Sequence, residues 1–149
     1  MDRLTKEKRS WNMAKVTGKN TKPELLVRSA LHKLGYRFRL HVRQLPGAPD
    51  IVLPKHKAVI FVHGCFWHGH DGCKGGSIPK TRPRFWQNKI YENKSRDRRV
   101  LDELQEKRWR VGVVWECALR NNKEIDSTSG RLGKWIQSGS GDLELPIRQ

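Results

Sequence analysis

Apolar side chains recur at helical spacing in two segments of the 149-residue chain. The first segment runs from Thr21 to Gly35 and places apolar residues three or four positions apart: Leu26, Ala30, Leu31 and Leu34. Thr21 followed by Glu24 has the form of a capping box, in which two side chains satisfy backbone N–H groups at a helix start. Gly35 favours the end of a helix. A helix is therefore predicted between these residues.

A second, longer helix is predicted from about Arg84 to Lys107. Its apolar stripe contains Phe85, Trp86, Ile90, Tyr91, Val100, Leu101 and Leu104. The stripe is interrupted, because steps of three and four residues from Trp86 reach Asn93 and Asp97 before they reach Val100. Polar side chains on an inward face need a reason, so both are candidates for a functional site.

Short runs of β-branched and aromatic residues, separated by Pro or Gly, predict the strands. They are Tyr36 to His41, Asp50 to Leu53, Lys57 to His63 and Trp109 to Glu116. Helices and strands in this order predict an α/β fold with one central mixed sheet flanked by helices. The segment from Gly64 to Pro83 has no periodicity and is expected to be a loop ordered by a metal.

The chain length fits one domain. Residues 21–120 are expected to form its core. Residues 1–20 are polar and basic and are expected to form a DNA-binding arm outside that core. Residues 121–149 are expected to be a tail that holds at most a short helix around Leu132 to Ile136.

The charge of the chain implies a polyanionic partner. Its 31 Lys and Arg face 15 Asp and Glu, and the net charge of +16 exceeds what solubility needs. Nucleic acid is the leading candidate, since the sequence shows no long apolar segment, basic amphipathic helix or lipidation signal. The first 20 residues lack the apolar core of a signal peptide, so a cytoplasmic protein is expected. The odd number of cysteines, three, favours metal ligands or buried thiols over disulfides.

Asp50 and His63 form the first candidate site. Asp50 starts one predicted strand and His63 ends the next. A carboxylate at a strand end can hold Mg²⁺, which orients a phosphate, activates a water and stabilises transition-state charge. Many nucleases pair such an Asp with an acid-x-Lys triplet; here the triplet is Phe61-Val62-His63, with His63 in place of the lysine. The alternative is that Pro49-Asp50 simply begins a turn or strand.

The second candidate site uses every cysteine of the chain and one histidine: Cys65, His70, Cys73 and Cys117. Zn²⁺ binds four N or S ligands tetrahedrally, and such a closed site is structural. His68 is an alternative to His70. The competing interpretation is that three buried thiols happen to lie near surface histidines.

The third candidate set is aromatic. Phe66 and Trp67 are adjacent in the Gly-rich loop, so they are unlikely both to point inward, and apolar wedges on a basic protein can enter between base steps. Core packing is the better interpretation of Trp86. For Glu24, capping alone is a sufficient explanation. Asp97, with three arginines beside it, could also be an ordinary salt-bridged residue.

Together these segments resemble the very-short-patch repair (Vsr) endonucleases, over the span from Arg9 to Leu119. The stretch HGCFWH, from His63 to His68, is highly specific. The residues that carry the resemblance are Arg9-Ser10, Asn12-Met13, Asn20 to Glu24, Leu45-Pro46-Gly47, Pro49-Asp50, Val59-Ile60-Phe61, His63 to His68, Phe85-Trp86, Arg96-Asp97, Trp109-Arg110-Val111 and Val114 to Cys117.

The resemblance implies a restriction-endonuclease-like fold of the PD-(D/E)xK type, a structural zinc and a catalytic Mg²⁺. It implies a nick 5′ of the mismatched thymine in a T:G pair left by deamination of 5-methylcytosine. The implied partners are double-stranded DNA with that mismatch, mismatch-repair helper proteins and, functionally, a cytosine-5 DNA methyltransferase. A monomer associated with a bacterial nucleoid is expected.

The resemblance also implies roles for individual residues. Asp50 and the backbone carbonyl of Val62 would bind magnesium, and His63 and Asp97 would organise the waters around it. His68 and Glu24 would be the acid/base pair. The zinc ligands would be Cys65, His70, Cys73 and Cys117. The DNA contacts would come from Phe66, Trp67 and Trp86 at the mismatch, from Asn93, and from the arm in the minor groove.

This chain departs from the family pattern at a few positions. Val62 stands where threonine is usual, and Ala48 replaces a basic or polar residue. One extra residue before Cys73 lengthens the zinc segment, and Gly75 and Gly76 replace bulkier residues. Two other functions fit parts of the pattern: a sequence-specific restriction endonuclease of the same fold, and a non-catalytic zinc-stapled DNA-binding module.

Overall fold

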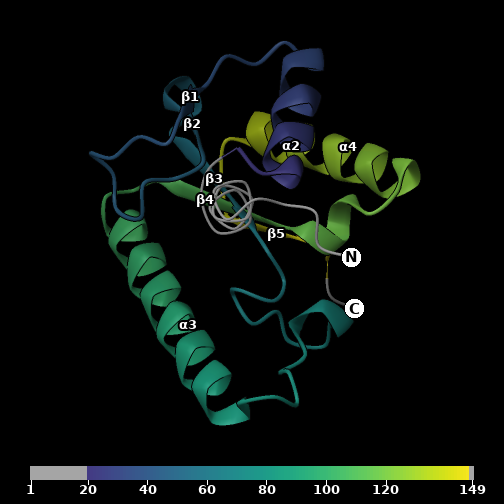
Figure 1. Cartoon of the computed structure of the whole chain (residues 1–149). Helices are drawn as coiled ribbons and strands as arrows, with labels where there is room; N and C mark the ends of the chain where they lie inside the picture. The colour runs from purple at the N-terminus through teal and green to yellow at the C-terminus, as the bar shows by residue number, and fades with distance from the viewer. Residues whose placement is uncertain (1–19, 148–149) are drawn as a thin grey trace, which may run out of the picture.

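The computed structural model describes residues 20–147, which form a five-stranded mixed sheet with helices on both faces (Figure 1). The strand order is β1-β2-β3-β4-β5; β1 to β3 are antiparallel neighbours, and β3, β4 and β5 run parallel. The strands are β1 (Arg39–Leu40), β2 (Ile51–Leu53), β3 (Ala58–His63), β4 (Arg110–Trp115) and β5 (Leu143–Leu145). The helices are α2 (Lys22–Lys33), α3 (Pro83–Glu106) and α4 (Asn122–Ser138), with short 3-10 turns η1 (Pro54–His56), η2 (Lys74–Gly76) and η3 (Glu116–Leu119). The predicted mixed α/β sheet flanked by helices is confirmed.

Alternation along the strands divides the core between the two faces of the sheet. On one face, Ile51 and Ile60 pack with α2 and α4, which lie side by side above the sheet in Figure 1. On the other face, Val52 and Val59 pack with Leu104 of α3. Each strand of the sheet centre is therefore buried on both sides, as its continuous apolar sequence requires.

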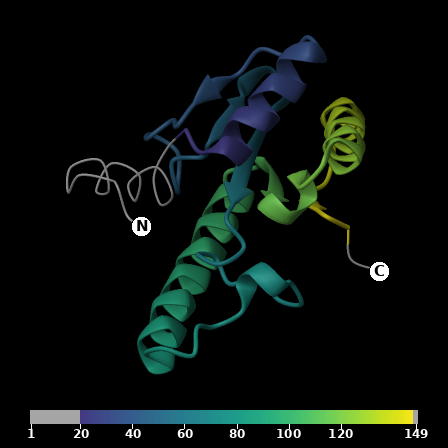
Figure 2. The ribbon, with the colours of Figure 1, turned by 45° about the vertical axis from the view of Figure 1, so that its right-hand side comes forward.

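Only the C-terminal part of the long helix α3 covers the sheet. Its buried residues are Ile90 and Leu104, and its N-terminal part reaches past the sheet beside the loop that follows β3 (Figure 2). The interruption at Asn93 and Asp97 falls on this part, so the polar residues face the loop and not the apolar core. None of the helices described here is both long and apolar enough to cross a bilayer.

The helix predicted in the C-terminal tail was too short. Instead of a short helix near Leu132 to Ile136, α4 spans 17 residues and is capped by Asn121, whose side chain accepts from the Glu124 N–H. The polar residues and the glycine between Asp126 and Arg131 have low helix propensity, so the sequence pattern did not predict the full helix. Burial of the apolar side chains of α4 supplies the stability that these residues do not. The strand β5 was not predicted; it adds Leu145 to the core.

The predicted strand from Tyr36 to His41 was too long, since only Arg39 and Leu40 pair with β2. The remaining predicted helices and strands agree with the structure to within one or two residues at each end. The basic arm expected over residues 1–20 lies outside the described residues except for Asn20.

Candidate active site and metal centre

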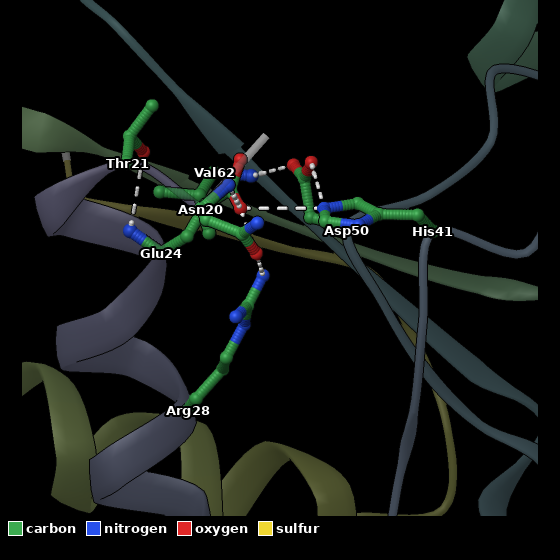
Figure 3. Close-up of polar contacts among 7 residues, drawn as sticks. All are labelled: Asn20, Thr21, Glu24, Arg28, His41, Asp50 and Val62. Carbon is green, nitrogen blue, oxygen red and sulfur yellow. Dashed lines mark hydrogen bonds and ion pairs between the residues drawn. The ribbon is translucent and has the colours of Figure 1, made fainter. Parts of the chain in front are cut away.

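Asp50 lies at the start of β2, beside the C-terminal half of β3. The antiparallel register pairs Ile51 with Ile60, which brings the next residues of β3 to the Asp50 side chain. The Val62 N–H donates to Asp50 Oδ2 at 2.7 Å (Figure 3). The expected role of the Val62 carbonyl as a metal ligand stays a prediction; the observed contact is made by its amide.

Glu24 reaches Asp50 from the first turn of α2. Thr21 Oγ1 accepts from the Glu24 N–H at 3.5 Å, which is the helix cap that the sequence predicts. The Glu24 carboxylate does not close a capping box on Thr21; its Oε2 accepts from the Asn20 N–H at 2.8 Å and from Arg28 at 3.0 Å. It is 2% exposed. Capping therefore accounts for the backbone of Glu24 but not for its buried carboxylate, which belongs to the group Glu24, His41 and Asp50, three possible metal ligands.

The pKa of Asp50 is raised to about 7, mainly by burial and in addition by the neighbouring carboxylate of Glu24. The hydrogen bond from Val62 and the charge of Arg28 act in the opposite direction without cancelling the effect. Two carboxylates held together in a poorly solvated place carry their charges most readily when a cation lies between them. The donor set and its electrostatics thus fit a hard divalent cation such as Mg²⁺.

A second group lies at the end of β3. His68 Nδ1 and Asp97 Oδ2 are 2.7 Å apart, and the rings of His63 and His68 are stacked with centroids 3.9 Å apart. Burial lowers the pKa of His63 to about 3, so this imidazole is neutral at physiological pH. Its buried Nδ1 has no hydrogen-bond partner among the described residues, and a buried polar atom of this kind needs a reason.

The predicted sulfur site is assembled in the structure. The ligand atoms of Cys65, His70, Cys73 and Cys117 all lie within 4.8 Å of one another. His70 Nδ1 is 3.5 Å from both Cys65 Sγ and Cys117 Sγ, whereas His68 belongs to the group with His63 and Asp97. Burial raises the pKa of the Cys65 thiol to about 12, so ionisation of this thiol needs a cation. One nitrogen and three sulfurs in this arrangement fit Zn²⁺.

Three residues to which the sequence assigned no role connect the histidine group of His63 with the Cys/His group. They are Trp115, Glu116 and Glu144. Trp115, at the end of β4, stacks on His70 with centroids 4.1 Å apart and meets His63 edge-on. Its Nε1 donates to Glu144 of β5 at 2.8 Å. Glu116 Oε1 accepts from the Cys65 N–H at 2.9 Å. Neither Glu116 nor Glu144 has a local motif, so their roles depend on sheet pairings that spacing alone does not reveal.

The aromatic residues of the loop and of α3 form one cluster. Trp86 meets Phe66 and Trp67 edge-to-face, with centroids 5.2 and 5.9 Å apart, and Phe85 continues the cluster. Phe66, Trp67 and Trp86 are each only partly buried. Asn93 Nδ2 donates to the Trp67 carbonyl at 2.8 Å. The expectation that Asn93 faces a functional segment thus has a structural basis, and the aromatic cluster is accessible at one end of the sheet.

One open cleft, of about 1350 Å³, joins most of the predicted site residues. Asp50, His63, His68, Asp97 and Glu24 line it, together with Phe66, Trp67 and Asn93. A smaller hollow on the other side of the loop is lined by His70, Cys73 and Cys117. Side chains of the loop from Gly64 to Cys73 therefore contribute to two sites. One site contains carboxylates and histidines, and the other contains the three cysteines with His70.

The sequence of the chain is similar to those of known proteins. The family model described as DNA mismatch endonuclease Vsr matches residues 1–74. The chain is 55% identical over 118 residues to the type II nicking enzyme V.XorIIP of Xanthomonas oryzae, covering 79% of this chain and 86% of that protein. It is 44% identical over 133 residues to the DNA mismatch endonuclease Vsr of Escherichia coli, covering 88% of this chain and 85% of that protein. The chain belongs to the Vsr family.

A further Vsr-family relative is the type II nicking enzyme V.NmeAIP of Neisseria meningitidis, 48% identical over 136 residues, which cover 91% of this chain and 96% of that protein. Family membership makes the chain a DNA endonuclease, a hydrolase whose substrate is DNA. The cleft of carboxylates and histidines is the candidate place for that reaction in this Vsr-family chain, and the Cys/His group is a second possible metal site.

Proposed function

We propose that this Vsr-family chain nicks one strand of double-stranded DNA 5′ of the mismatched thymine in a T:G pair and so starts very-short-patch repair. The observation that carries the proposal is the single cleft that joins Asp50, Glu24, His63, His68 and Asp97 next to the aromatic cluster. The five-stranded mixed sheet, with Asp50 and the Phe61-Val62-His63 triplet on neighbouring strands, supports a restriction-endonuclease-like fold of the PD-(D/E)xK type.

The proposed reaction is hydrolysis of a phosphodiester. A water oxygen forms a bond to phosphorus, and the bond from phosphorus to the leaving deoxyribose oxygen breaks. Glu24 and His68 lie on opposite elements of the cleft, on α2 and on the loop after β3, so one can accept the proton of the water while the other gives a proton to the leaving oxygen. Asp97 holds His68 through the 2.7 Å contact, and neutral His63 stacks on the His68 ring and restricts its rotation.

Asp50 and the carbonyl of Val62 are the proposed ligands of a catalytic Mg²⁺. When bound there, the ion supplies Lewis-acid stabilisation of charge on the phosphate. The high pKa of Asp50 supports this assignment, because binding of a cation allows the buried carboxylate to ionise. Zn²⁺, held by Cys65, His70, Cys73 and Cys117, has the structural role of fixing the loop that carries His68.

Recognition of the mismatch is proposed to depend on Phe66, Trp67 and Trp86. An apolar wedge must pay for unstacking, which costs a few kcal/mol per base step and least at a mismatch. The edge-to-face contacts among the three rings hold them as one rigid body, so little side-chain entropy is lost on insertion. A monomer suits a nick in one strand. A cytosine-5 DNA methyltransferase is the proposed functional partner, and mismatch-repair helper proteins are proposed to assist turnover.

A strand-labelled cleavage assay with Mg²⁺ tests the proposal. Duplexes carrying T:G in varied sequence contexts are compared with T:A duplexes, using the wild type, Asp50→Ala and the control Asp102→Ala, which changes an exposed helix residue. We expect a nick 5′ of the thymine that the T:A duplexes lack and that Asp50→Ala loses by at least about 1000-fold, since several kcal/mol of transition-state stabilisation is removed.

The other outcomes separate the alternatives. Cleavage of T:A duplexes as well as T:G duplexes would favour a restriction endonuclease. Binding to DNA without cleavage in any context, by protein shown to be folded and metal-loaded, would favour a zinc-stapled binding module.

A further inference from the structure

His41 occupies a constrained place beside the carboxylates of the cleft. It follows β1, and its backbone lies in the left-handed region with φ of 47°, a conformation that is unfavourable for a residue with a Cβ. Its N–H donates to the Asp50 carbonyl at 3.3 Å. The backbone of His41 is therefore tied to the same residue whose side chain forms the site.

The side chain of His41 turns toward both acids. Its Nε2 is 3.3 Å from Glu24 Oε2 and 3.8 Å from Asp50 Oδ1, and the side chain is 12% exposed (Figure 3). Figure 3 shows the ring lying between the loop after β1 and the first turn of α2, with the Asp50 carboxylate above it. An imidazole in this position bridges helix α2, through Glu24, and the start of strand β2, through Asp50.

The other N–H donors on the Glu24 carboxylate do not come from the sheet. Asn20 precedes α2, and Arg28 lies one turn later in the same helix, so both belong to the helix segment itself. Glu24 and Asp50 repel each other when both are ionised. His41 is the residue that places an N–H donor on Glu24 from the side of β1 and β2, where its own backbone is fixed by Asp50.

We propose that His41 is a positioning residue of the nuclease centre. Its Nε2–H donates to Glu24 and thereby holds that carboxylate against Asp50, in the orientation in which Glu24 can exchange a proton with the reacting water or leaving oxygen. The role rests on the proposed function of the cleft. It adds a residue between helix α2 and the sheet that no sequence motif marks.

The first test is a double-mutant cycle measured by single-turnover nicking at saturating Mg²⁺. Removing a hydrogen bond to a charged acceptor should slow His41→Ala by about 10- to 100-fold. His41→Gln should recover most of the rate, since its amide N–H can reach the same oxygen. In a Glu24→Gln background, His41→Ala should cost no more than about threefold further, because a residue that acts through Glu24 has little left to position. Independent, multiplying losses would overturn the proposal.

The second test measures binding of Mn²⁺ to the DNA-free protein by electron paramagnetic resonance of the unbound ion. His41→Ala should bind Mn²⁺ about 3- to 10-fold more weakly, because the pair of carboxylates is no longer held together, and His41→Gln should stay within about twofold of wild type. Loss of Mn²⁺ binding in both variants would overturn the positioning role in favour of direct ligation by the imidazole. Unchanged binding and rate in His41→Ala would overturn it as well.

Controls keep the two proposals separate. His32→Gln changes an exposed histidine at the other end of α2 and should match wild type in both tests. Melting temperature and zinc content report whether each variant is folded. If the wild type nicks no mismatched duplex, the proposed function fails, and the Mn²⁺ series then decides the role of His41 without reference to nicking.

Discussion

At the scale of single residues, burial decides which groups of the cleft carry charge. Burial moves the pKa of Asp50 upward to about 7 and that of His63 downward to about 3, so both tend toward their neutral forms in the metal-free protein. A neutral His63 beside His68 avoids repulsion between two stacked cations. Ionisation of Asp50 is likewise disfavoured near neutral pH until a cation binds.

Asp50→Asn is expected to abolish nicking and to stabilise the magnesium-free protein at pH 8. The pKa of Asp50 is higher in the native state than its ordinary value of 3.8, so its contribution to stability is fully present below pH 4 and is lost as pH rises through 7. Asparagine can still accept from Val62 without this loss. Urea unfolding with zinc retained should show the variant more stable at pH 8 by roughly 1 to 4 kcal/mol, with a smaller gain at pH 5.

The exposed residue Asp102 supplies the matched control, and Asp102→Asn should leave the difference between pH 5 and pH 8 as in wild type. Saturating Mg²⁺ should reduce the advantage of Asp50→Asn, since the ion stabilises only the wild-type site. An Asp50→Asn protein that is less stable than wild type at pH 8 would contradict the argument from burial.

Substitutions of His68 and His70 should have opposite consequences. His70 lies with the three cysteines, so His70→Ala should lose zinc and several kcal/mol of folding free energy. His68 lies with His63 and Asp97, so His68→Ala should keep its zinc and its melting temperature but lose nicking. Zinc content by atomic emission, melting and single-turnover rates check both; loss of zinc from His68→Ala would reverse the assignment.

At the scale of elements, the loop after β3 depends on close packing against α3. Gly69, which follows His68 in the sequence, is buried and has φ of +62°. It lies so close to α3 that a Cβ at this position would collide with Ile90 and come within 2.8 Å of Lys94 Cε. A glycine at this place lets the backbone approach the helix that carries Asp97. The short distance between His68 and Asp97 follows from that approach.

Gly69→Ala should therefore destabilise the protein by about 1 to 3 kcal/mol and lower nicking more than zinc content. Gly72→Ala is the matched control, because Gly72 lies in the same loop with φ of +75° but has open space around its Cβ position. Both variants share the backbone strain, so the difference between their unfolding free energies measures the packing against α3. Equal effects would show that strain alone matters.

The sequence predicted α2, α3 and strands β2 to β4 because their apolar patterns are strong and are bounded by Pro and Gly. It could not predict β5, whose three residues gain their stability from pairing with β4. Asp50 and His63 could be selected from their places at strand ends. The roles of His41, Glu116 and Glu144 could not be predicted, since each acts through contacts with residues distant in the sequence. Glu116 belongs to a stretch that carries the family resemblance, but that stretch does not reveal its contact.

At the scale of the whole molecule, the net charge of +16 makes binding to DNA sensitive to salt. Each phosphate neutralised by Lys or Arg contributes about 0.9 to the slope of log affinity against log salt concentration. With the Asp50→Ala protein, affinity for matched duplex should fall with a slope equivalent to roughly five or more phosphate contacts. The ratio of T:G to T:A affinity should change little, because the proposed discrimination between them depends on stacking by uncharged rings. Fluorescence anisotropy between low and moderate salt checks both, and a slope near zero would contradict the electrostatic part.

The place of β5 in the sheet has a consequence for synthesis of the protein. The core cluster that contains Val27 and Leu31 also contains Leu145, so this cluster is incomplete until the ribosome has added Leu145. Arg110 of β4 likewise bonds carbonyls of α4 that are made later. All the residues of the cleft up to Asp97 thus leave the ribosome before the sheet that orders them can close. A nascent chain without β5 therefore carries much of the positive charge of the protein before the core beneath the nuclease site is complete.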